Sequence, residues 1–221
     1  MRNNSPEAAR MIDRRSLLTL AATGAAGLLL PRLGWAQAAA PAPLAEDDPR
    51  LAERSAGPAD APVTVLEYFS LTCGHCAAFH RETWPRVKTE LVQAGRMRMV
   101  FRDFPLDGLA LAAAAVARSL PAPQYEPFIS ALLGSQDRWA FNRNADPREE
   151  LYKMAALAGM SRARYDEVLA DQALQRAILA ARVKGQQEHN VTSTPTFVFG
   201  RRAVPGNMAF GRFAALVAET R

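Results

Sequence analysis

The chain has 221 residues, of which 49% are hydrophobic, and a formal net charge of +5 at pH 7. The first 38 residues hold five arginines against Glu7 and Asp13, so only +2 of that charge belongs to the rest of the chain. The rest contains no run of five or more Lys or Arg residues, and we therefore exclude nucleic acid as a partner.

The N-terminal segment has the layout of an export signal. A basic region ends in an arginine pair at 14–15, an uncharged apolar run covers 16–30, and a small-residue site lies at 36–38. We predict cleavage near Ala38. The apolar run is shorter than the roughly 20 residues of a membrane-spanning helix, although an uncleaved anchor remains the alternative. The arginine pair is compatible with export by the Sec or the twin-arginine route.

The next part of the chain predicts a strand, a helix and a strand. Residues 39–61 are rich in Pro, Ala and charge, and we interpret them as a linker or loosely held lead-in. The β-branched and aromatic stretch 63–69 predicts a buried strand, and 97–104 a second one. Between them, apolar spacing predicts a helix over 73–95, which Pro85 should kink or split.

The second half of the chain is mainly helical in pattern. Helices are predicted at 109–119, 125–136, 147–158, 161–169 and 172–188. Two short strands, 197–199 and 203–204, and a last helix over 209–219 follow. The exported part, about 183 residues, suits one domain that contains an insertion.

Both cysteines of the chain stand in LTCGHCAA at 71–78, as Cys73 and Cys76. A structural disulfide is not expected here, because closing a four-residue loop stabilises a protein by only about 2 kcal/mol, against about 4.7 kcal/mol for a 100-residue loop. Covalent haem attachment requires a histidine directly after the second cysteine, and Ala77 occupies that position. Export places the pair in an oxidising compartment, where a disulfide persists.

A metal site is an alternative for the two thiols. Structural zinc needs four ligands, and the chain has no second cysteine pair. Cys73, Cys76 and His80 can share one helix face, so a zinc or copper(I) site that uses these three residues stays open. His80 itself is expected to be a solvated helix residue. We expect no metal and no other cofactor in the chemistry.

The spacing of the cysteines favours thiol–disulfide exchange. Unpaired N–H groups at the first turn of a helix should stabilise Cys73 as a thiolate. Gly74 is expected to let the backbone turn closely around this sulfur, and His75 to donate to it or to place a charge beside it. Cys76, one turn further in, should be shielded and should resolve a mixed disulfide at Cys73. A lowered Cys73 pKa would make the disulfide form an oxidant.

The stretch VLEYFSLTCGHCAAFH at 65–80 resembles the active-site segment of the DsbA-like branch of the thioredoxin superfamily. Two further stretches are similar to that family, RDFPL at 102–106 and VTSTPTFVFG at 191–200. The resemblance implies an α/β thioredoxin fold, formed by residues 62–108 and 186–221, with an inserted all-helical domain at 109–185.

The same resemblance implies roles for three residues besides the cysteines and His75. Glu67 would help protons to reach and leave the buried cysteine, unless it faces solvent on an edge strand. Pro195 would be a cis-proline that faces the cysteine pair and blocks metal capture. The backbone of Thr194 would pair with an extended substrate as an added strand.

In function, the resemblance implies a periplasmic thiol–disulfide oxidoreductase that mainly oxidises unfolded or partly folded exported proteins and is reoxidised by a DsbB-like membrane partner. However, Gly74-His75 resembles the eukaryotic protein disulfide isomerases, and Thr194 resembles the bacterial isomerases. An isomerase or reductase, kept reduced by a DsbD-like membrane donor, is therefore the alternative. A metal-binding protein that uses Cys73, Cys76 and His80 is the third reading.

Overall fold

The structure is a computed structural model that describes residues 42–220. The predicted export signal at 1–38 and its cleavage near Ala38 lie outside the described residues. Within 42–220, none of the helices combines the length and the apolar character that spanning a bilayer requires.

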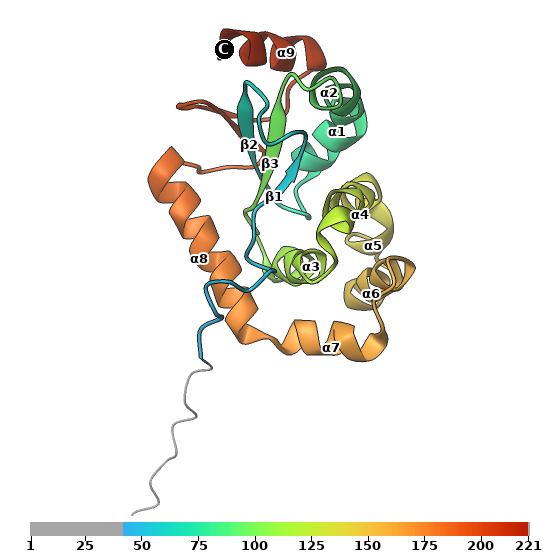
Figure 1. The fold of residues 1–221 in the computed structure, drawn as a ribbon. Coiled ribbons are helices and arrows are strands. Elements are labelled where there is room, and N and C mark those ends of the chain that lie inside the picture. Colours follow the sequence, from blue (N-terminus) through green and yellow to red (C-terminus); the bar gives the residue numbers. More distant parts are fainter. Residues whose placement is uncertain (1–41, 221) are drawn as a thin grey trace, which may run out of the picture. The chain divides into compact units, whose positions relative to one another are not determined.

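Five strands of the described residues form one mixed sheet in the order β1-β3-β2-β4-β5 (Figure 1). They are β1 (Arg54–Ala56), β2 (Thr64–Phe69), β3 (Arg98–Asp103), β4 (Thr196–Phe199) and β5 (Arg202–Pro205). The central strand, β2, runs parallel to β3 and antiparallel to β4, and its Val65 lies opposite both Met99 and Phe199. Residues that the sequence separates by well over 100 positions thus meet at β2.

Strand β1 was not predicted. It pairs antiparallel with β3, and Arg54 lies opposite Phe101. The interpretation of 39–61 as a loose linker is therefore wrong for Arg54–Ala56. A three-residue strand is too short to show an alternating pattern, so only its pairing with β3 defines it.

The predicted helix over 73–95 is divided. It consists of α1 (Gly74–Glu82), α2 (Trp84–Val87) and a π-helical turn, η1 (Lys88–Val92). The break lies at Thr83, two positions before Pro85, which occupies the first turn of α2. Proline lacks an N–H group and its ring crowds the preceding turn, so the split that Pro85 predicted is confirmed.

The remaining helices lie close to the predicted ranges. They are α3 (Gly108–Arg118), α4 (Ala122–Gly134), α5 (Gln136–Trp139), α6 (Pro147–Leu157), α7 (Arg162–Ala170), α8 (Gln172–His189) and α9 (Phe210–Glu219). The main difference is that 125–136 begins earlier, at Ala122, and ends before a separate short α5. Side-chain oxygens of Asp107, Ser161 and Asp171 accept N–H groups of the first turns of α3, α7 and α8, which fixes where these helices begin.

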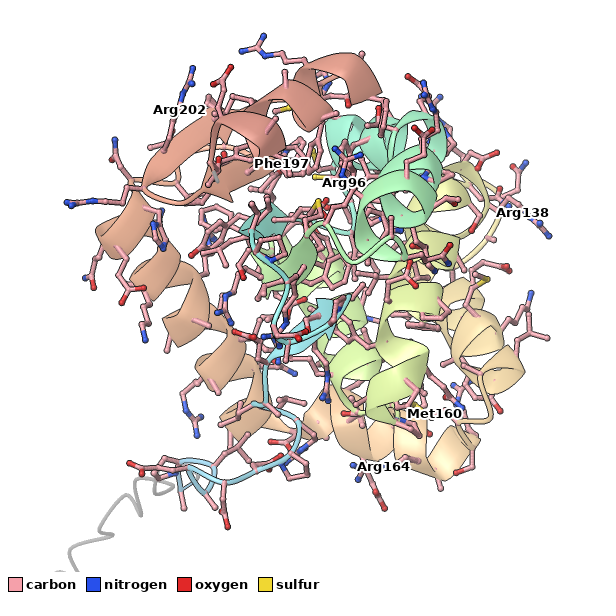
Figure 2. All side chains as sticks on the ribbon, turned by 45° about the horizontal axis from the view of Figure 1, so that its top comes forward. Arg96, Arg138, Met160, Arg164, Phe197 and Arg202 are labelled. Atoms are coloured by element: carbon pink, nitrogen blue, oxygen red, sulfur yellow. The ribbon has the colours of Figure 1, made fainter. Side chains whose placement is uncertain are left out.

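One face of the sheet packs against α1 and α9. Side chains alternate along β2, so Val65, Glu67 and Phe69 share this face. The ring of Phe197 on β4 lies 4.5 Å from that of Phe79 on α1 and 5.5 Å from that of Phe213 on α9, centroid to centroid. Figure 2 shows Phe197 inside the body of the protein, whereas Arg138 and Arg202 project outward from it.

The other face of the sheet packs against α8. Tyr68 is 3% exposed and meets Phe104 edge to face. A Cβ atom at Gly185 of α8 would lie only 2.4 Å from the Tyr68 ring. Figure 1 shows α8 on the opposite side of the sheet from α1, returning from the helical insertion toward β4. The last helix of the insertion, α8, therefore packs directly on the sheet.

Candidate active site

Cys73 is the N-cap residue of α1, with an extended backbone conformation. Its N–H donates to the Ser70 carbonyl at 3.1 Å, and its own carbonyl accepts the Ala77 N–H at 3.0 Å. Cys73 is 9% exposed, whereas Cys76 is 0% exposed, and both are free thiols in this structure. The thiol nearer to solvent is thus the one at the open N-terminus of the helix, as the spacing predicted.

Side chains from the start and the middle of the insertion hold the loop that precedes α1. The Gln136 amide, which is buried, donates to the carbonyls of Leu71 at 2.7 Å and of Cys73 at 3.1 Å. The Thr72 hydroxyl donates to Asp107 at 2.6 Å. Sequence reasoning did not find Gln136, because nothing local marks a glutamine that folding brings 63 positions back to Cys73.

The Thr194-Pro195 peptide bond is cis, as predicted. The Cys73 thiol donates to the Thr194 carbonyl at 3.3 Å, across 121 positions of sequence. The Gly206 N–H in turn donates to the Pro195 carbonyl at 2.7 Å, which ties this loop to the end of β5. The loop and the cysteine pair therefore form one site.

The two thiols differ in acidity. The Cys76 thiol donates to Cys73 and is the main reason why the pKa of Cys73 is lowered to about 5. Burial opposes this effect, and Thr194 and two backbone N–H groups strengthen it. Burial raises the pKa of Cys76 well above its ordinary value, and its hydrogen bond to Cys73 adds to that rise. Cys73 is accordingly the nucleophilic thiolate at neutral pH, and Cys76 stays protonated.

Of the two residues between the cysteines, His75 contributes to the site through its backbone, and Gly74 lies in open space. His75 is exposed, and it is its backbone N–H that helps to lower the pKa of Cys73. A Cβ atom at Gly74 would meet no atom within 4 Å. The packing therefore gives no support to the expectation that Gly74 lets the backbone turn closely around the sulfur, because a side chain would also fit at that position.

Glu67 and His80 form a buried pair on the sheet side of α1. Both side chains have no exposed surface, and His80 Nε2 lies 3.0 Å from Glu67 Oε1. Glu67 belongs to the central strand, so it does not face solvent on an edge. The prediction that His80 is solvated is wrong. Its ring packs among aromatic residues of the core, Phe69, Phe79 and Trp84.

The described residues offer no group of three or more His, Cys, Asp and Glu side chains placed to hold a metal ion. His80 directs one ring nitrogen to Glu67 and the other to Ser130, at 3.4 Å. The structure therefore does not bring Cys73, Cys76 and His80 together as a set of ligands.

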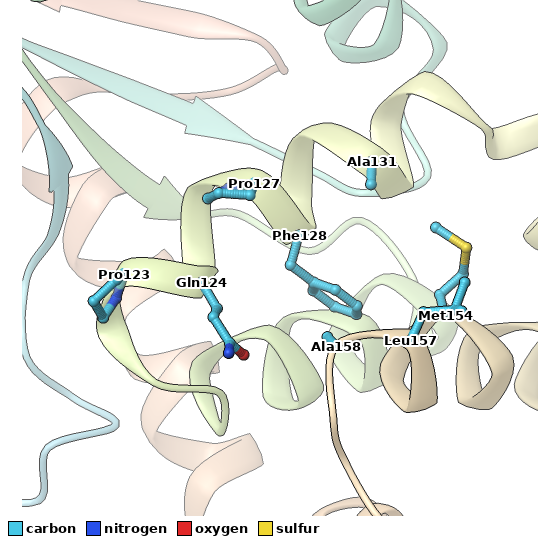
Figure 3. Close-up of a pocket in the computed structure, with 8 residues that line it drawn as sticks. All are labelled: Pro123, Gln124, Pro127, Phe128, Ala131, Met154, Leu157 and Ala158. Carbon is cyan, nitrogen blue, oxygen red and sulfur yellow. The ribbon is translucent and has the colours of Figure 1, made fainter.

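A separate groove of about 410 Å³ lies in the helical insertion between α4 and α6 (Figure 3). Its lining is mainly apolar and comprises Pro123, Gln124, Pro127, Phe128, Ala131, Met154, Leu157 and Ala158. The lining includes none of the residues that the sequence predicted for the site.

The chain is similar to known thiol–disulfide exchange proteins both in sequence and in fold. Residues 50–219 match the profile of the family Thioredoxin_4, described as thioredoxin. A relative from Rickettsia typhi, named among the protein-disulfide oxidoreductases, is 29% identical over 136 residues, which are 61% of this chain and 50% of that protein. The thiol:disulfide interchange protein DsbA of Bordetella parapertussis is 27% identical over 151 residues, 66% of this chain and 68% of that protein. The chain spans about half the length of the rickettsial relatives that it matches.

Solved structures share the fold. The α-DsbA1 protein of Wolbachia pipientis superimposes with a TM-score of 0.70 at 26% identity, covering 76% of this chain and 90% of that one. A protein-disulfide isomerase from Novosphingobium aromaticivorans gives a TM-score of 0.66 at 20% identity, over 76% of this chain and 97% of that one. The second likeness concerns the fold alone.

Proposed function

The chain belongs to the Thioredoxin_4 family, a DsbA-like branch of the thioredoxin fold, and from this premise we propose that it is a protein thiol–disulfide oxidoreductase. The observation that carries the proposal is the unequal pair of thiols. Cys73 lies at the mouth of the site with a pKa of about 5, and Cys76 lies behind it, buried and protonated. Thiol–disulfide exchange needs one thiolate that attacks or is attacked and a second thiol that resolves the mixed disulfide.

In the proposed reaction, a substrate thiolate attacks Cys73 in the Cys73–Cys76 disulfide, and a bond between the substrate sulfur and Cys73 forms. The bond between the two cysteines breaks, and Cys76 takes up the electron pair and a proton. A second substrate thiolate then displaces Cys73, which leaves as a thiolate. The substrate gains a disulfide and the protein becomes the dithiol.

Oxidation is the direction that we propose. The low pKa of Cys73 stabilises the dithiol form at neutral pH, which makes the disulfide form the stronger oxidant. The alternative direction, isomerase or reductase, requires a pair that is held reduced.

Substrate recognition is proposed to occur at the loop that contains the cis-proline. In the dithiol form the Thr194 carbonyl accepts the Cys73 thiol. Cys73 carries no hydrogen as a thiolate or in a mixed disulfide, so this carbonyl is then free to pair with the backbone of an extended substrate. Glu67 is proposed to exchange protons with Cys76. The substrates would be unfolded or partly folded exported proteins in the periplasm, and a DsbB-like membrane partner would reoxidise the dithiol.

The test combines Cys73→Ala, Cys76→Ala and a redox titration. Oxidation of a reduced model protein should be abolished by Cys73→Ala. When Cys76→Ala is incubated with a model protein that contains a disulfide, its Cys73 thiolate should attack that disulfide and accumulate as a mixed disulfide that mass spectrometry detects. Activity that survives Cys73→Ala would refute the proposed site. Titration of the wild-type pair against glutathione, with its redox form trapped in cells, decides the direction. A pair that is mostly reduced in the periplasm would refute the oxidase.

A further inference from the structure

A line of hydrogen bonds runs from the buried Glu67–His80 pair to the surface of the helical insertion. His80 Nδ1 lies 3.4 Å from the Ser130 hydroxyl of α4. Ser130 donates to Glu126 Oε1 at 3.0 Å, one turn earlier on the same helix. The other oxygen of Glu126 accepts from Lys88 at 2.6 Å, and the Lys88 side chain is 38% exposed. Each contact along this line, from Glu67 to the partly exposed Lys88, joins two polar atoms at 3.4 Å or less.

The charge of Glu67, at the inner end of the line, acts on the resolving thiol. Glu67 Oε1 is engaged by His80, whereas Oε2 is buried and has no hydrogen-bond partner among the described residues. The Glu67 carboxylate also contributes to the raised pKa of Cys76, so the two groups are in electrostatic contact. A buried carboxyl oxygen without a partner is costly, and its position beside a thiol that must lose and regain a proton gives it a use.

The donors along the line can be assigned by counting hydrogens. Ser130 has one hydroxyl hydrogen, which it gives to Glu126, so the contact with His80 requires Nδ1–H as donor. Glu67 Oε1 and His80 Nε2 then share one hydrogen across their 3.0 Å contact. The donors of His80 and Ser130 both point outward, toward Glu126.

We propose that His80, Ser130 and Glu126 relay the proton of Cys76 between Glu67 and solvent, through the helical insertion. This inference rests on the proposed function and extends it, because it gives the insertion a part in the exchange reaction. His80 and Ser130 are positioning residues, since neither touches a sulfur atom.

When the disulfide closes, Cys76 attacks Cys73 in a mixed disulfide and the Cys73–Cys76 bond forms. The bond between Cys73 and the substrate sulfur breaks, and the substrate leaves as a thiolate with the electron pair. The Cys76 proton passes to Glu67 Oε2, and the hydrogen shared between Oε1 and His80 Nε2 stays on His80. His80 Nδ1 gives its hydrogen to Ser130, and Ser130 gives its own to Glu126, which releases it to solvent. Opening of the disulfide reverses each transfer.

Other titratable groups near the line are already engaged elsewhere. Asp103 of β3, Arg118 of α3 and Tyr125 of α4 bind one another. Around His80 itself, α1, α2 and β2 place aromatic rings rather than charges, apart from Glu67. The insertion thus supplies the route out of the core, by way of α4.

Ser130→Ala tests the relay, because it removes one hydroxyl and leaves the Glu67–His80 pair in place. Ser135→Ala is the matched control: this serine ends the same helix and its hydroxyl donates only to the Ala131 carbonyl. Rapid-quench measurements with a dithiol peptide, on the full-length protein, give the rates of disulfide opening and closing. A glutathione titration gives the reduction potential of each variant.

We expect Ser130→Ala to slow opening and closing by the same factor, about tenfold or more, with the reduction potential unchanged. A relay changes the rates in both directions and leaves the equilibrium alone, whereas a structural disturbance also shifts the potential. Wild-type rates in Ser130→Ala, equal slowing in Ser135→Ala, or slowing in one direction with a shifted potential would each overturn the relay. Failure of the proposed function looks different, since the wild-type protein would then show no exchange at all.

Discussion

Cys73 and Cys76 carry the same side chain three positions apart, yet the fold gives them opposite acid–base behaviour. The difference comes from their places on α1. Cys73 caps the helix, where backbone N–H groups and the Cys76 thiol point at its sulfur. Cys76 lies one turn inside, with no exposed surface and with the Glu67 carboxylate as a neighbour. One residue is therefore made to ionise and the other to keep its proton.

The first prediction concerns the hydrogen bond between the two thiols. Cys76→Ala should raise the pKa of Cys73 from about 5 toward the value of about 8.5 for a free thiol, because it removes the largest stabilising donor. Cys76→Ser should raise it less, since serine keeps an O–H donor. The ultraviolet absorbance of the thiolate as a function of pH measures both. An unchanged Cys73 pKa in Cys76→Ala would show that the helix terminus alone is responsible.

The second prediction concerns stability and pH in the dithiol form. The folded pKa of Cys73 is lowered, so the unfolded chain binds more protons between pH 5 and about 8.5, and the free energy of unfolding should rise with pH in that interval. Below pH 5 this contribution is lost. Cys76 has a raised pKa and acts in the opposite sense, so its contribution should decline above about pH 8.5.

Urea unfolding under reducing conditions measures this dependence. Cys73→Ser is the reference, since it lacks the low-pKa thiol and should show a smaller rise between pH 5.5 and pH 8. Equal pH slopes in the wild type and in Cys73→Ser would contradict the lowered pKa of Cys73.

At the scale of the helices, one glycine of α1 and one of α8 differ in the space around them, and we therefore expect alanine to have opposite effects on stability at the two positions. Gly74 begins α1 in open space, whereas Gly185 lies where α8 crosses the Tyr68 ring. Both are helical positions, so intrinsic helix propensity favours alanine at each by up to about 1 kcal/mol. The free space around each position therefore decides whether alanine stabilises or destabilises the protein there.

The third prediction compares the two glycines directly. Gly74→Ala should leave the free energy of unfolding unchanged or raise it by up to about 1 kcal/mol. Gly185→Ala should lower it by about 1–3 kcal/mol, because the new methyl group would lie within 2.4 Å of the Tyr68 ring and force apart the helix and the sheet. Thermal and urea unfolding of the two variants provide the measurement. Stabilisation by Gly185→Ala would mean that α8 does not pack on Tyr68 as described.

In the whole molecule, a buried polar cluster joins the segment before β2, the sheet and the insertion. Arg118 of α3 forms a buried ion pair with Asp103 of β3, and Tyr125 of α4 donates to the same carboxylate at 3.0 Å. Arg118 also donates to the carbonyl of Arg50 at 2.8 Å, and Arg54 donates to the carbonyl of Arg118 at 3.1 Å. These contacts explain why the residues around β1 are ordered although their composition resembles that of a linker.

The fourth prediction follows from this cluster. Arg118→Met should lower the free energy of unfolding by about 3–5 kcal/mol, because it leaves the Asp103 carboxylate buried without its cation. Limited proteolysis should then cut before β2, where the arginine no longer holds the backbone. Arg164→Met serves as the control. It removes an exposed ion pair with Glu167 and should change stability by less than about 1 kcal/mol. Similar losses in both variants would contradict the cluster's structural role.

The amino-acid sequence by itself determined the local part of this protein. Strand periodicity, proline positions and capping residues predicted most helices and strands, since these depend on neighbours a few positions away. The spacing of Cys73 and Cys76 argued against a structural disulfide, Ala77 argued against a haem site, and the resemblance identified Glu67 and Pro195 as candidate site residues.

The tertiary structure decided what depends on distant partners. Arg54–Ala56 is a strand only because β3 lies beside it, and His80 is buried only because Glu67 and Ser130 come from 13 and 50 positions away to bind it. Gln136 reaches Cys73 in the same way. The surroundings of a side chain, which set its charge and its chemistry, arise from contacts between segments distant in sequence. The proposed proton route from Cys76 to solvent depends on such contacts, so only the fold could suggest it.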